Sequence, residues 1–381
     1  MYIKSTNSQN INLSLTIYNN IALINESRFL PNPTPDSNPD INIEYFNISK
    51  FINEASVMVA GIDDFMMTFN YICCYNENNN QNSCNDCSTL IPESILIKAS
   101  NVKSNEIKTS YLTSNVNWSG SYTIIFEEET LEIHSWFNLI NKSGLDYNDI
   151  SLKIVAGDIN LPYKQLYISN VTNELPHFSL ESSSTYKSGI IDYYIYTLPN
   201  KYTLQNNTIK RIKNFYKSAI TYNRVYDFGY DSINANITIN FLNTSENNLG
   251  FPLPSGSINT YIQANGNYEF VGGSSINDIA KNREVSFVIG NSFDVTCQRN
   301  IINVQKYQNY ILKQIQYVII NTKKEAVFIK ICEPIFAAWQ MDSSSDKYSI
   351  DANNNPCFFT TMESNSRKEI SFNYKYNSQS T

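Results

Sequence analysis

The sequence predicts an all-β protein made of antiparallel β-sandwich modules, with little or no helix. Short runs of alternating apolar and polar residues recur along the chain, and turn-forming residues separate them at intervals of about 8 to 12 residues. No segment has the apolar period of about 3.6 residues that marks an amphipathic helix. With 381 residues, of which 42% are hydrophobic, the chain is long enough for roughly two or three domains with their own cores.

Charge is scarce in this chain. Only 17% of residues are charged, against about a quarter in typical soluble domains, and 27 tyrosines and many asparagines supply much of the polarity. Such a surface repels a second copy weakly, so subunits can be held together by hydrogen bonds and stacked rings. AT-rich codon usage is the alternative explanation of this composition. The net charge of -7 and the lack of a basic stripe argue against nucleic acid as a partner.

The first ten residues lack the basic start, apolar core and cleavage pattern of a secretory signal. No apolar run approaches about 18 residues, so no membrane span is expected. We therefore expect synthesis in a cytoplasm, without export by the general secretory route. A location at a bacterial spore or cell surface and a permanently cytoplasmic location both stay open.

We assign residues 1–110 to an N-terminal region of β strands. A hairpin is expected from strands at 13–18 and 21–24, with Asn19-Asn20 as its turn. The prolines that follow indicate an extended linker: Pro31, Pro33, Pro35 and Pro39. Strands are expected to resume at 41–46 and 56–59.

A cysteine- and asparagine-rich loop is predicted at residues 71–90. It contains Cys73, Cys74, Cys84 and Cys87, and it lacks the periodicity of a strand or helix. The Cys84-x-x-Cys87 spacing is that of a zinc knuckle, but a tetrahedral site needs a second such pair, and the adjacent Cys73 and Cys74 point to opposite sides of a strand. Disulfides are therefore favoured over zinc, with unpaired thiols as the other alternative. Since the chain has seven cysteines, at least one is free or bonded to another molecule. These four residues are our candidates for cross-links between subunits.

The clearest hairpin signals lie between residues 111 and 162. A strand at 121–126 precedes the acidic turn 127–129, and the next strand places Leu131, Ile133, Phe137 and Leu139 on one face. We expect residues 141–144 to close a second hairpin before a strand at 150–155, because Gly144 can adopt positive φ without steric cost.

Residues 111–381 are assigned to a β-sandwich region, and a division into two sandwiches near 245–255 is left open. Asn265-Gly266 predicts a type I′ hairpin, and residues 321–325 predict a hairpin between strands at 317–320 and 326–329. The other expected strands lie at 193–196, 233–241, 285–289, 293–295 and 369–376.

The residues that could carry chemistry do not form a recognisable pattern. Cys297, Cys332 and Cys357 lie in apolar strands, where buried and inert thiols are expected. The only histidines are His134, expected on a solvated strand face, and His177. The acidic pairs and triplets at 63–64 and 127–129 are expected to be solvated charges in turns, and Gly272-Gly273 precedes no helix that could bind phosphate. We therefore predict no catalytic, cofactor-binding or metal-binding residues, and no cofactor.

Several motifs are similar to those of a known family. They are residues 16–19 with 22–24, Trp118 with Tyr122, residues 141–152 with 156–157, residues 204–212, residues 243–256 and residues 290–295. On these motifs the chain resembles the bacterial family catalogued as domain of unknown function 4139. The resemblance implies a mostly β fold and no particular reaction, since the family's activity is not established. Many relatives carry an export signal and a helical insertion before the position of Trp118, where this chain has its cysteine-rich loop.

The function expected from the sequence is structural and non-enzymatic. A protein that lacks an export signal but carries cross-linkable cysteines suggests a bacterial endospore coat, exosporium or appendage, assembled inside a mother cell. We expect subunits that assemble with copies of themselves into a surface layer or filament, with other surface proteins as further candidate partners. A soluble β-sandwich module that binds glycan or peptide is the alternative, and an enzyme of unrecognised type is the third possibility.

Overall fold

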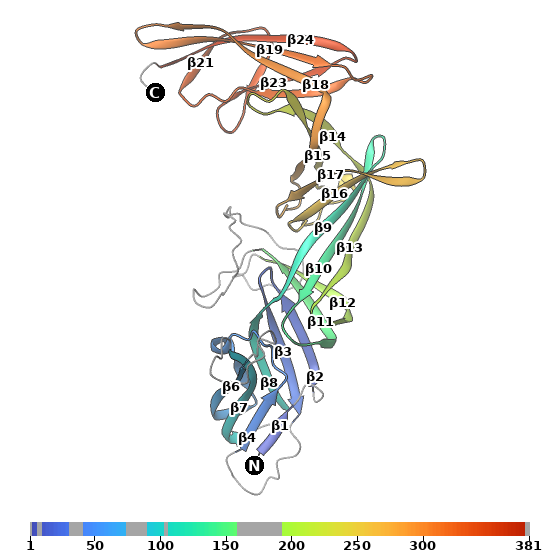
Figure 1. Cartoon of the computed structure of the whole chain (residues 1–381), viewed down its shortest axis with the longest axis vertical. Helices are drawn as coiled ribbons and strands as arrows, with labels where there is room; N and C mark the ends of the chain where they lie inside the picture. Colours follow the sequence, from blue (N-terminus) through green and yellow to red (C-terminus); the bar gives the residue numbers. More distant parts are fainter. Residues whose placement is uncertain are drawn as a thin grey trace, which may run out of the picture. The chain divides into compact units, whose positions relative to one another are not determined.

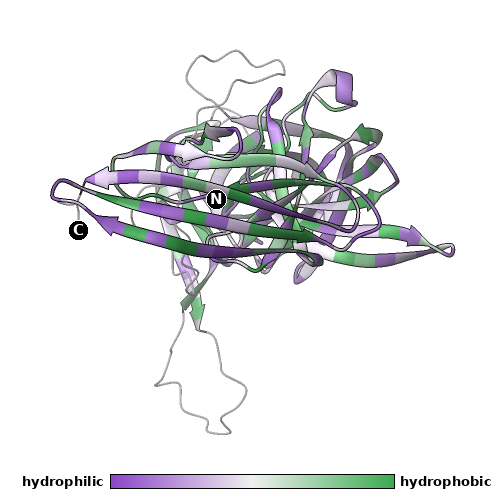
Figure 2. Cartoon of the chain, turned by 90° about the horizontal axis from the view of Figure 1, so that it is seen from above, coloured by the Kyte–Doolittle hydropathy of each residue, from purple (hydrophilic) through white to green (hydrophobic). Residues whose placement is uncertain are grey.

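The structure is a computed structural model that describes residues 2–5, 10–29, 41–73, 90–102, 106–157 and 193–377. Within these ranges every regular element is a strand, except for the short 3-10 helices η2 (Glu54–Ser56) and η3 (Ser245–Asn247). Hydrophobic and hydrophilic residues alternate along the strands, as Figure 2 shows. The predicted all-β fold is confirmed. No helix in the described ranges is long and apolar enough to cross a membrane.

The chain divides into two compact units (Figure 1). Unit 1 comprises residues 1–121 and 136–214, and unit 2 comprises residues 122–135 and 215–381. This division differs from the one expected at residue 110, which falls inside strand β8 (Glu106–Ser114). The reason is that early strands of the chain pair with later ones, so contiguous sequence does not define a compact body.

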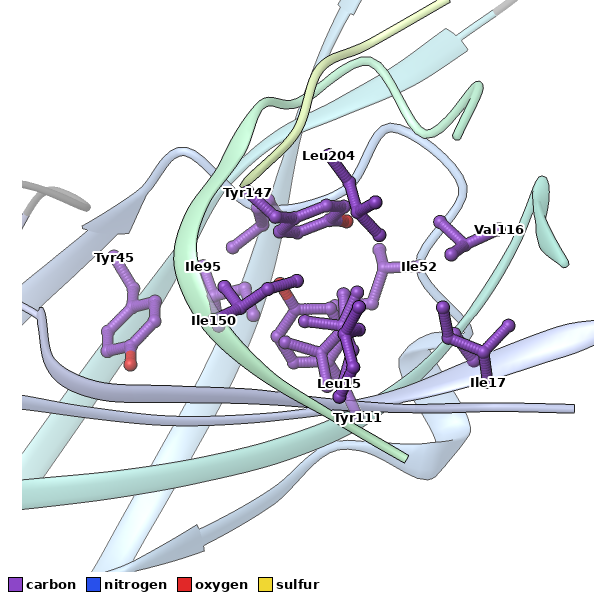
Figure 3. Close-up of a cluster of buried hydrophobic side chains, with 14 of the residues drawn as sticks. Leu15, Ile17, Tyr45, Ile52, Ile95, Tyr111, Val116, Tyr147, Ile150 and Leu204 are labelled. Carbon is purple, nitrogen blue, oxygen red and sulfur yellow. The ribbon is translucent and has the colours of Figure 1, made fainter. Parts of the chain in front are cut away.

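Unit 1 packs two sheets around one core. A six-stranded sheet has the order β12 (Tyr194–Leu204), β11 (Tyr147–Ala156), β2 (Asn10–Ile17), β3 (Ile21–Phe29), β8, β5 (Met58–Ala60). A four-stranded sheet has the order β1 (Tyr2–Ser5), β4 (Ile41–Phe46), β7 (Leu90–Val102), β6 (Ile62–Cys73). Tyr45 and Ile95 from the smaller sheet belong to the same buried cluster as Leu15 and Tyr111 from the larger one (Figure 3).

Unit 2 contains a nine-stranded sheet that folds over its own core. Its order is β21 (Trp339–Ser344), β24 (Ser366–Asn377), β19 (Tyr310–Asn321), β18 (Glu284–Lys306), β15 (Asn234–Leu242), β14 (Asn223–Phe228), β20 (Val327–Cys332), β23 (Pro356–Met362), β22 (Tyr348–Ile350). Phe358 of β23 and Phe372 of β24 are far apart in this order, yet their ring centroids are 4.9 Å apart. The two halves of the sheet therefore face each other across one hydrophobic cluster.

A five-stranded sheet completes the described fold. Its order is β13 (Thr208–Thr221), β10 (Thr130–Asn141), β9 (Val116–Phe126), β16 (Gly256–Ala264), β17 (Asn267–Ile276). The residues predicted to share a face of β10, namely Leu131, Ile133, Phe137 and Leu139, are all buried. Asn265 and Gly266 both have positive φ, at 51° and 80°, so the predicted hairpin between β16 and β17 is confirmed with the geometry of a type I′ turn.

The same strand connectivity occurs twice. In unit 1, β11 pairs in parallel with β2 and antiparallel with β12, and β3 pairs antiparallel with both β2 and β8. In unit 2, β20 pairs in parallel with β14 and antiparallel with β23, and β15 pairs antiparallel with both β14 and β18. The neighbours β9, β10 and β13 likewise correspond to β18, β19 and β24. We conclude that the fold contains an internal repeat.

One buried asparagine marks the equivalent point of each repeat. Asn141, the last residue of β10, donates from Nδ2 to the carbonyl oxygens of Leu145 (2.8 Å) and Leu204 (2.9 Å). Asn321, the last residue of β19, donates in the same way to Glu325 (3.0 Å) and Glu363 (2.8 Å). In both cases the buried amide links the turn that follows it to a carbonyl group distant in the sequence.

The hairpins predicted at these two turns are wrong, because the strands on either side of each turn do not pair with each other. The strands expected around residues 141–144 and 321–325 are present, but β10 does not pair with β11, and β19 does not pair with β20. After each asparagine the chain instead enters a strand that pairs elsewhere: β11 pairs with β2 and β12, and β20 pairs with β14 and β23. Asp63 and Asp64 were also expected in a turn but lie within β6, where Asp64 has a φ of 48° at a local irregularity.

Replacing Gly272 with alanine is expected to destabilise the protein by about 2 kcal/mol, the typical cost of overpacking a tight site. A Cβ atom at this position would overlap the backbone carbonyl oxygen of Ile289, which cannot move without disturbing β18. Chemical denaturation of Gly272→Ala would measure the loss. Gly290→Ala is the matched control, because a Cβ atom there meets nothing within 4 Å. Equal stability of the two variants would contradict this account.

Candidate functional site: a disulfide and two buried charged clusters

The predicted cross-link cysteines lie mainly outside the described residues. Cys73 is the last residue of β6 and pairs with Leu90, the first residue of β7. Cys74, Cys84 and Cys87 fall in the segment between these two strands, outside the described ranges. The paired ends of β6 and β7 agree with a connection between hairpin strands, while the proposed cross-link stays a prediction.

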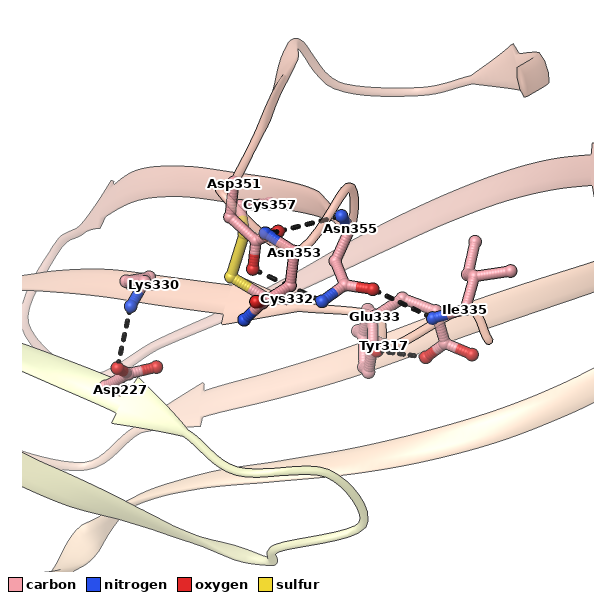
Figure 4. Close-up of a disulfide and its surroundings, with 10 residues drawn as sticks. All are labelled: Asp227, Tyr317, Lys330, Cys332, Glu333, Ile335, Asp351, Asn353, Asn355 and Cys357. Atoms are coloured by element: carbon pink, nitrogen blue, oxygen red, sulfur yellow. Dashed lines mark hydrogen bonds and ion pairs between the residues drawn. A yellow bond between two sulfur atoms is a disulfide. The ribbon is translucent and has the colours of Figure 1, made fainter. Parts of the chain in front are cut away.

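Cys332 and Cys357 form a disulfide (Figure 4). The prediction that both would be inert thiols is therefore wrong. Cys332 ends β20 and lies directly opposite Cys357 of β23, with a Cα–Cα distance of 4.0 Å. Opposed residues of an antiparallel pair point to the same face, which brings the two sulfur atoms together. Sequence reasoning missed the bond because it did not establish that β20 and β23 are neighbours.

The turn between β22 and β23 is held by the carboxylate of Asp351. This group accepts hydrogen bonds from the backbone N–H groups of Asn353 (2.9 Å) and Asn355 (2.8 Å), and the Asn355 side-chain oxygen accepts one from the N–H of Ile335 (2.9 Å). Ligand atoms of Cys332, Asp351 and Cys357 lie within 4.8 Å of one another. Because metals bind the thiolate form of cysteine, the disulfide form does not offer these sulfur atoms as ligands. The arrangement acts as a covalent staple.

A buried charged cluster lies next to the disulfide in the chain. Glu333, with a side chain only 1% exposed, accepts hydrogen bonds from Arg299 at Nε (2.8 Å) and Nη2 (2.5 Å) and from the hydroxyl of Tyr317 (2.6 Å). The hydrogen bonds to Glu333 raise the pKa of Arg299, and burial together with the Glu333 charge raises the pKa of Tyr317. Near neutral pH the guanidinium is therefore charged and the phenol neutral. The cluster is a buried salt bridge to which a neutral tyrosine donates a further hydrogen bond.

A similar cluster lies in the core of unit 1. Arg28 and Glu26 are both buried on β3, and Arg28 Nη2 donates to Glu26 Oε1 at 3.0 Å. Arg28 Nη1 donates to the carbonyl oxygen of Phe46 (2.7 Å), and its guanidinium lies 3.5 Å from the ring centroid of Tyr45. The Tyr45 hydroxyl in turn accepts a hydrogen bond from Thr109 (2.8 Å). Each unit thus buries an Arg–Glu pair beside a tyrosine.

The structure describes two of the three remaining candidates for chemistry, Cys297 and His134. Cys297 is buried and free, and burial raises the pKa of its thiol to about 12, so it is a poor nucleophile. His134 is partly exposed, with Nε2 3.7 Å from the Glu132 carboxylate and its ring beside Tyr216. This agrees with a solvated strand face. His177 lies outside the described residues.

The free energy of unfolding is expected to fall in alkali through Cys297. The thiol keeps its proton in the folded state up to about pH 12, whereas in the unfolded chain it ionises near its ordinary value of 9. The unfolded state therefore binds fewer protons above pH 9, and stability present below that pH is lost as pH rises, by about 1 kcal/mol at pH 10. Denaturation of the wild type and of Cys297→Ala at pH 8 and pH 10 isolates this contribution. The same pH dependence in both proteins would contradict it.

Removing the Cys332–Cys357 bond is expected to cost about 3 kcal/mol, because the chain between the cysteines regains freedom when unfolded. The sequence separation is 25 residues. Chemical denaturation of Cys332→Ala/Cys357→Ala should show this loss, and a reducing agent should destabilise the wild type but not the double variant. A wild type insensitive to reductant, with its thiols titrating as free, would show that the bond does not form.

No protein-family model and no curated protein matches this chain. The resemblance to domain of unknown function 4139 therefore stays a prediction. The described residues contain one disulfide, two compensated buried ion pairs, and two buried asparagines that hold the turns after β10 and β19.

Proposed function

We propose that this protein is a non-enzymatic structural subunit that assembles with copies of itself into a surface layer or filament. The observation that supports the proposal best is a concentration of exposed apolar side chains on β18 and the neighbouring loop 229–233. The chain exposes Phe293 by 89%, along with Tyr230, Ile233, Ile301, Ile302, Val304 and Tyr307. Contiguous exposed apolar surface is typical of sites that contact another protein.

The loop that carries Tyr230 and Ile233 lies beside β18. Ile233 accepts a backbone hydrogen bond from Cys297, four residues beyond Phe293 on β18. Tyr230, in the same loop as Ile233, lies beside the guanidinium of Arg299, with 5.0 Å from Arg299 Cζ to the ring centroid. The apolar side chains thus follow one strand and the loop beside it. This placement supports an interface along β18.

The low charge of the chain also supports assembly. With 17% charged residues, two copies meet weak long-range repulsion, and the neutral amides offer hydrogen bonds at a contact. The disulfide stabilises the subunit, which suits a protein that has to persist. Cross-links between subunits through Cys73, Cys74, Cys84 and Cys87 belong to the proposal, as does a place in an endospore coat, exosporium or appendage.

Electron microscopy of the purified full chain at increasing concentration, with and without reductant, tests the proposal. We expect polymers or sheets at high concentration, and in the cross-linked version their persistence in denaturant until reductant is added. A monomer at every concentration under both conditions would overturn self-assembly. A monodisperse protein that binds immobilised glycans or peptides would favour a binding module instead, and turnover of a substrate would favour an enzyme.

A further inference from the structure

We infer that the outer edge of β18, at residues 298–306, pairs antiparallel with the same edge of a second copy of this chain. This inference rests on the proposed self-assembly and names the surface that carries it. The joined surface would be a continuous sheet that crosses from one subunit to the next.

The unpaired edge of β18 begins where its pairing with β15 stops. β18 runs from Glu284 to Lys306, and its pairing with β15 extends only to Thr296, after which the N–H of Cys297 donates to Ile233. On the other side, β19 pairs with β18 as far as Lys306. In the part of the chain that the structure describes, residues 298–306 therefore have a neighbouring strand on one side only. The backbone groups facing the other side are available to a further strand.

The side chains of this edge favour such pairing. Between Arg299 and Lys306 the sequence is Asn-Ile-Ile-Asn-Val-Gln, with no charge and no proline. Ile301 and Ile302 are 53% and 52% exposed. β-Branched residues have high strand propensity, and a long edge that exposes them is a site of association unless charge, proline or shortness protects it.

The other described sheet edges also carry protective features of this kind. The edge strand β13 contains Lys210, Arg211, Lys213 and Lys217, and β12 contains Pro199 and Lys201. The edge strand β6 contains Asp63 and Asp64. The edge strands β1, β21 and β17 contain one charged residue each, namely Lys4, Asp342 and Glu269. The edge strands β5 and β22 have three residues each. Residues 300–305 of β18 contain neither charge nor proline, although its pairing with β19 has a register shift between Ile301 and Asn303.

A second copy fits this edge because antiparallel self-pairing is symmetric about a two-fold axis. With the axis at the centre of residues 300–305, Ile301 of one copy lies opposite Val304 of the other, and Ile302 lies opposite Asn303. These six residues then place no like charges across the interface. The nearest charges, Arg299 and Lys306, lie opposite each other at the ends, where Glu333 already compensates Arg299. β-Branched side chains meet near the centre, where they pack well.

Sedimentation velocity of the full chain over a range of concentrations tests the inference. We expect Ile302→Lys and Val304→Lys to weaken association at least about tenfold, because each places a lysine in the paired region. Phe336→Lys is the matched control: it also replaces an exposed apolar residue, 96% exposed, but lies between β20 and β21 and away from the edge. Circular dichroism with thermal unfolding verifies that every variant is folded.

Amide hydrogen exchange of the wild type provides a readout that needs no variant. Protection that rises with protein concentration at residues 298–306 is the expected result. A wild type that never associates would overturn both the proposed function and this inference. A wild type that associates, with edge variants that associate equally well or with protection confined to other strands, would overturn the edge pairing and leave self-assembly standing.

Discussion

Replacing Arg28 with methionine is expected to destabilise the protein by about 4 kcal/mol, because a buried carboxylate is left without its cation. Methionine keeps much of the volume and apolar stem of the arginine, so the loss reports mainly the charge. The variant removes three sets of contacts at once: the ion pair with Glu26, the hydrogen bond to Phe46, and the packing on Tyr45. Urea denaturation followed by circular dichroism measures the change.

A double variant separates the charge from the packing. In Arg28→Met/Glu26→Gln no uncompensated charge is buried. Much of the stability lost in Arg28→Met should therefore return, because replacing both partners of a buried ion pair costs far less than removing one of them. Arg367→Met is the surface control: its pair with Glu369 is exposed, and such pairs contribute less than about 1 kcal/mol. If Arg28→Met and Arg367→Met lose similar stability, the buried pair does not have the role given to it here.

The fold class could be predicted because alternation along a strand is a local property. The hairpins at Asn19-Asn20 and Asn265-Gly266 were placed correctly, since a two-residue turn determines the pairing of its flanking strands. The segments after Asn141 and Asn321 also contain turn-forming residues, so the sequence predicts hairpins there too. They join strands that do not pair, and the long-range acceptors that reveal this, Leu204 and Glu363, lie 63 and 42 residues away.

A sequence signal for the repeat does exist. Apolar residues precede both Asn141 and Asn321, and each asparagine is followed six positions later by a buried residue that begins the next strand, Tyr147 or Val327. The two segments share few identical residues, so the repeat emerges only when the strand pairings are compared. The structure thus supplies what a single sequence does not, namely which strands are neighbours.

The candidate site was harder to predict than the fold. Glu26, Arg28, Arg299 and Glu333 are charged residues in or beside strands, and such residues are mostly exposed unless a partner lies close by. Glu26 and Arg28 are two positions apart, so they share a strand face, but only the packing of Tyr45 shows that this face is buried. Arg299 and Glu333 are 34 residues apart and meet because the nine-stranded sheet folds over itself.

Replacing Glu333 with glutamine is expected to cost about 3 kcal/mol, because the amide keeps the shape of the side chain but not its charge. Arg299 would then lie in a largely buried site with Asp231 as its nearest remaining carboxylate, 3.6 Å away and itself exposed. The change should also lower the pKa of Tyr317 relative to the wild type, because the Glu333 charge is one of the causes that raise it. Chemical denaturation measures the loss of stability.

Two comparisons make the Glu333→Gln result specific. Arg299→Met/Glu333→Gln should recover part of the stability, since no uncompensated charge then remains in the cluster, whereas Glu369→Gln on the exposed pair should change stability by less than about 1 kcal/mol. The loss should appear as faster amide exchange in β18 and β19, which carry Arg299 and Tyr317, before any change in unit 1. If Glu333→Gln and Glu369→Gln lose similar stability, the buried cluster does not contribute as expected.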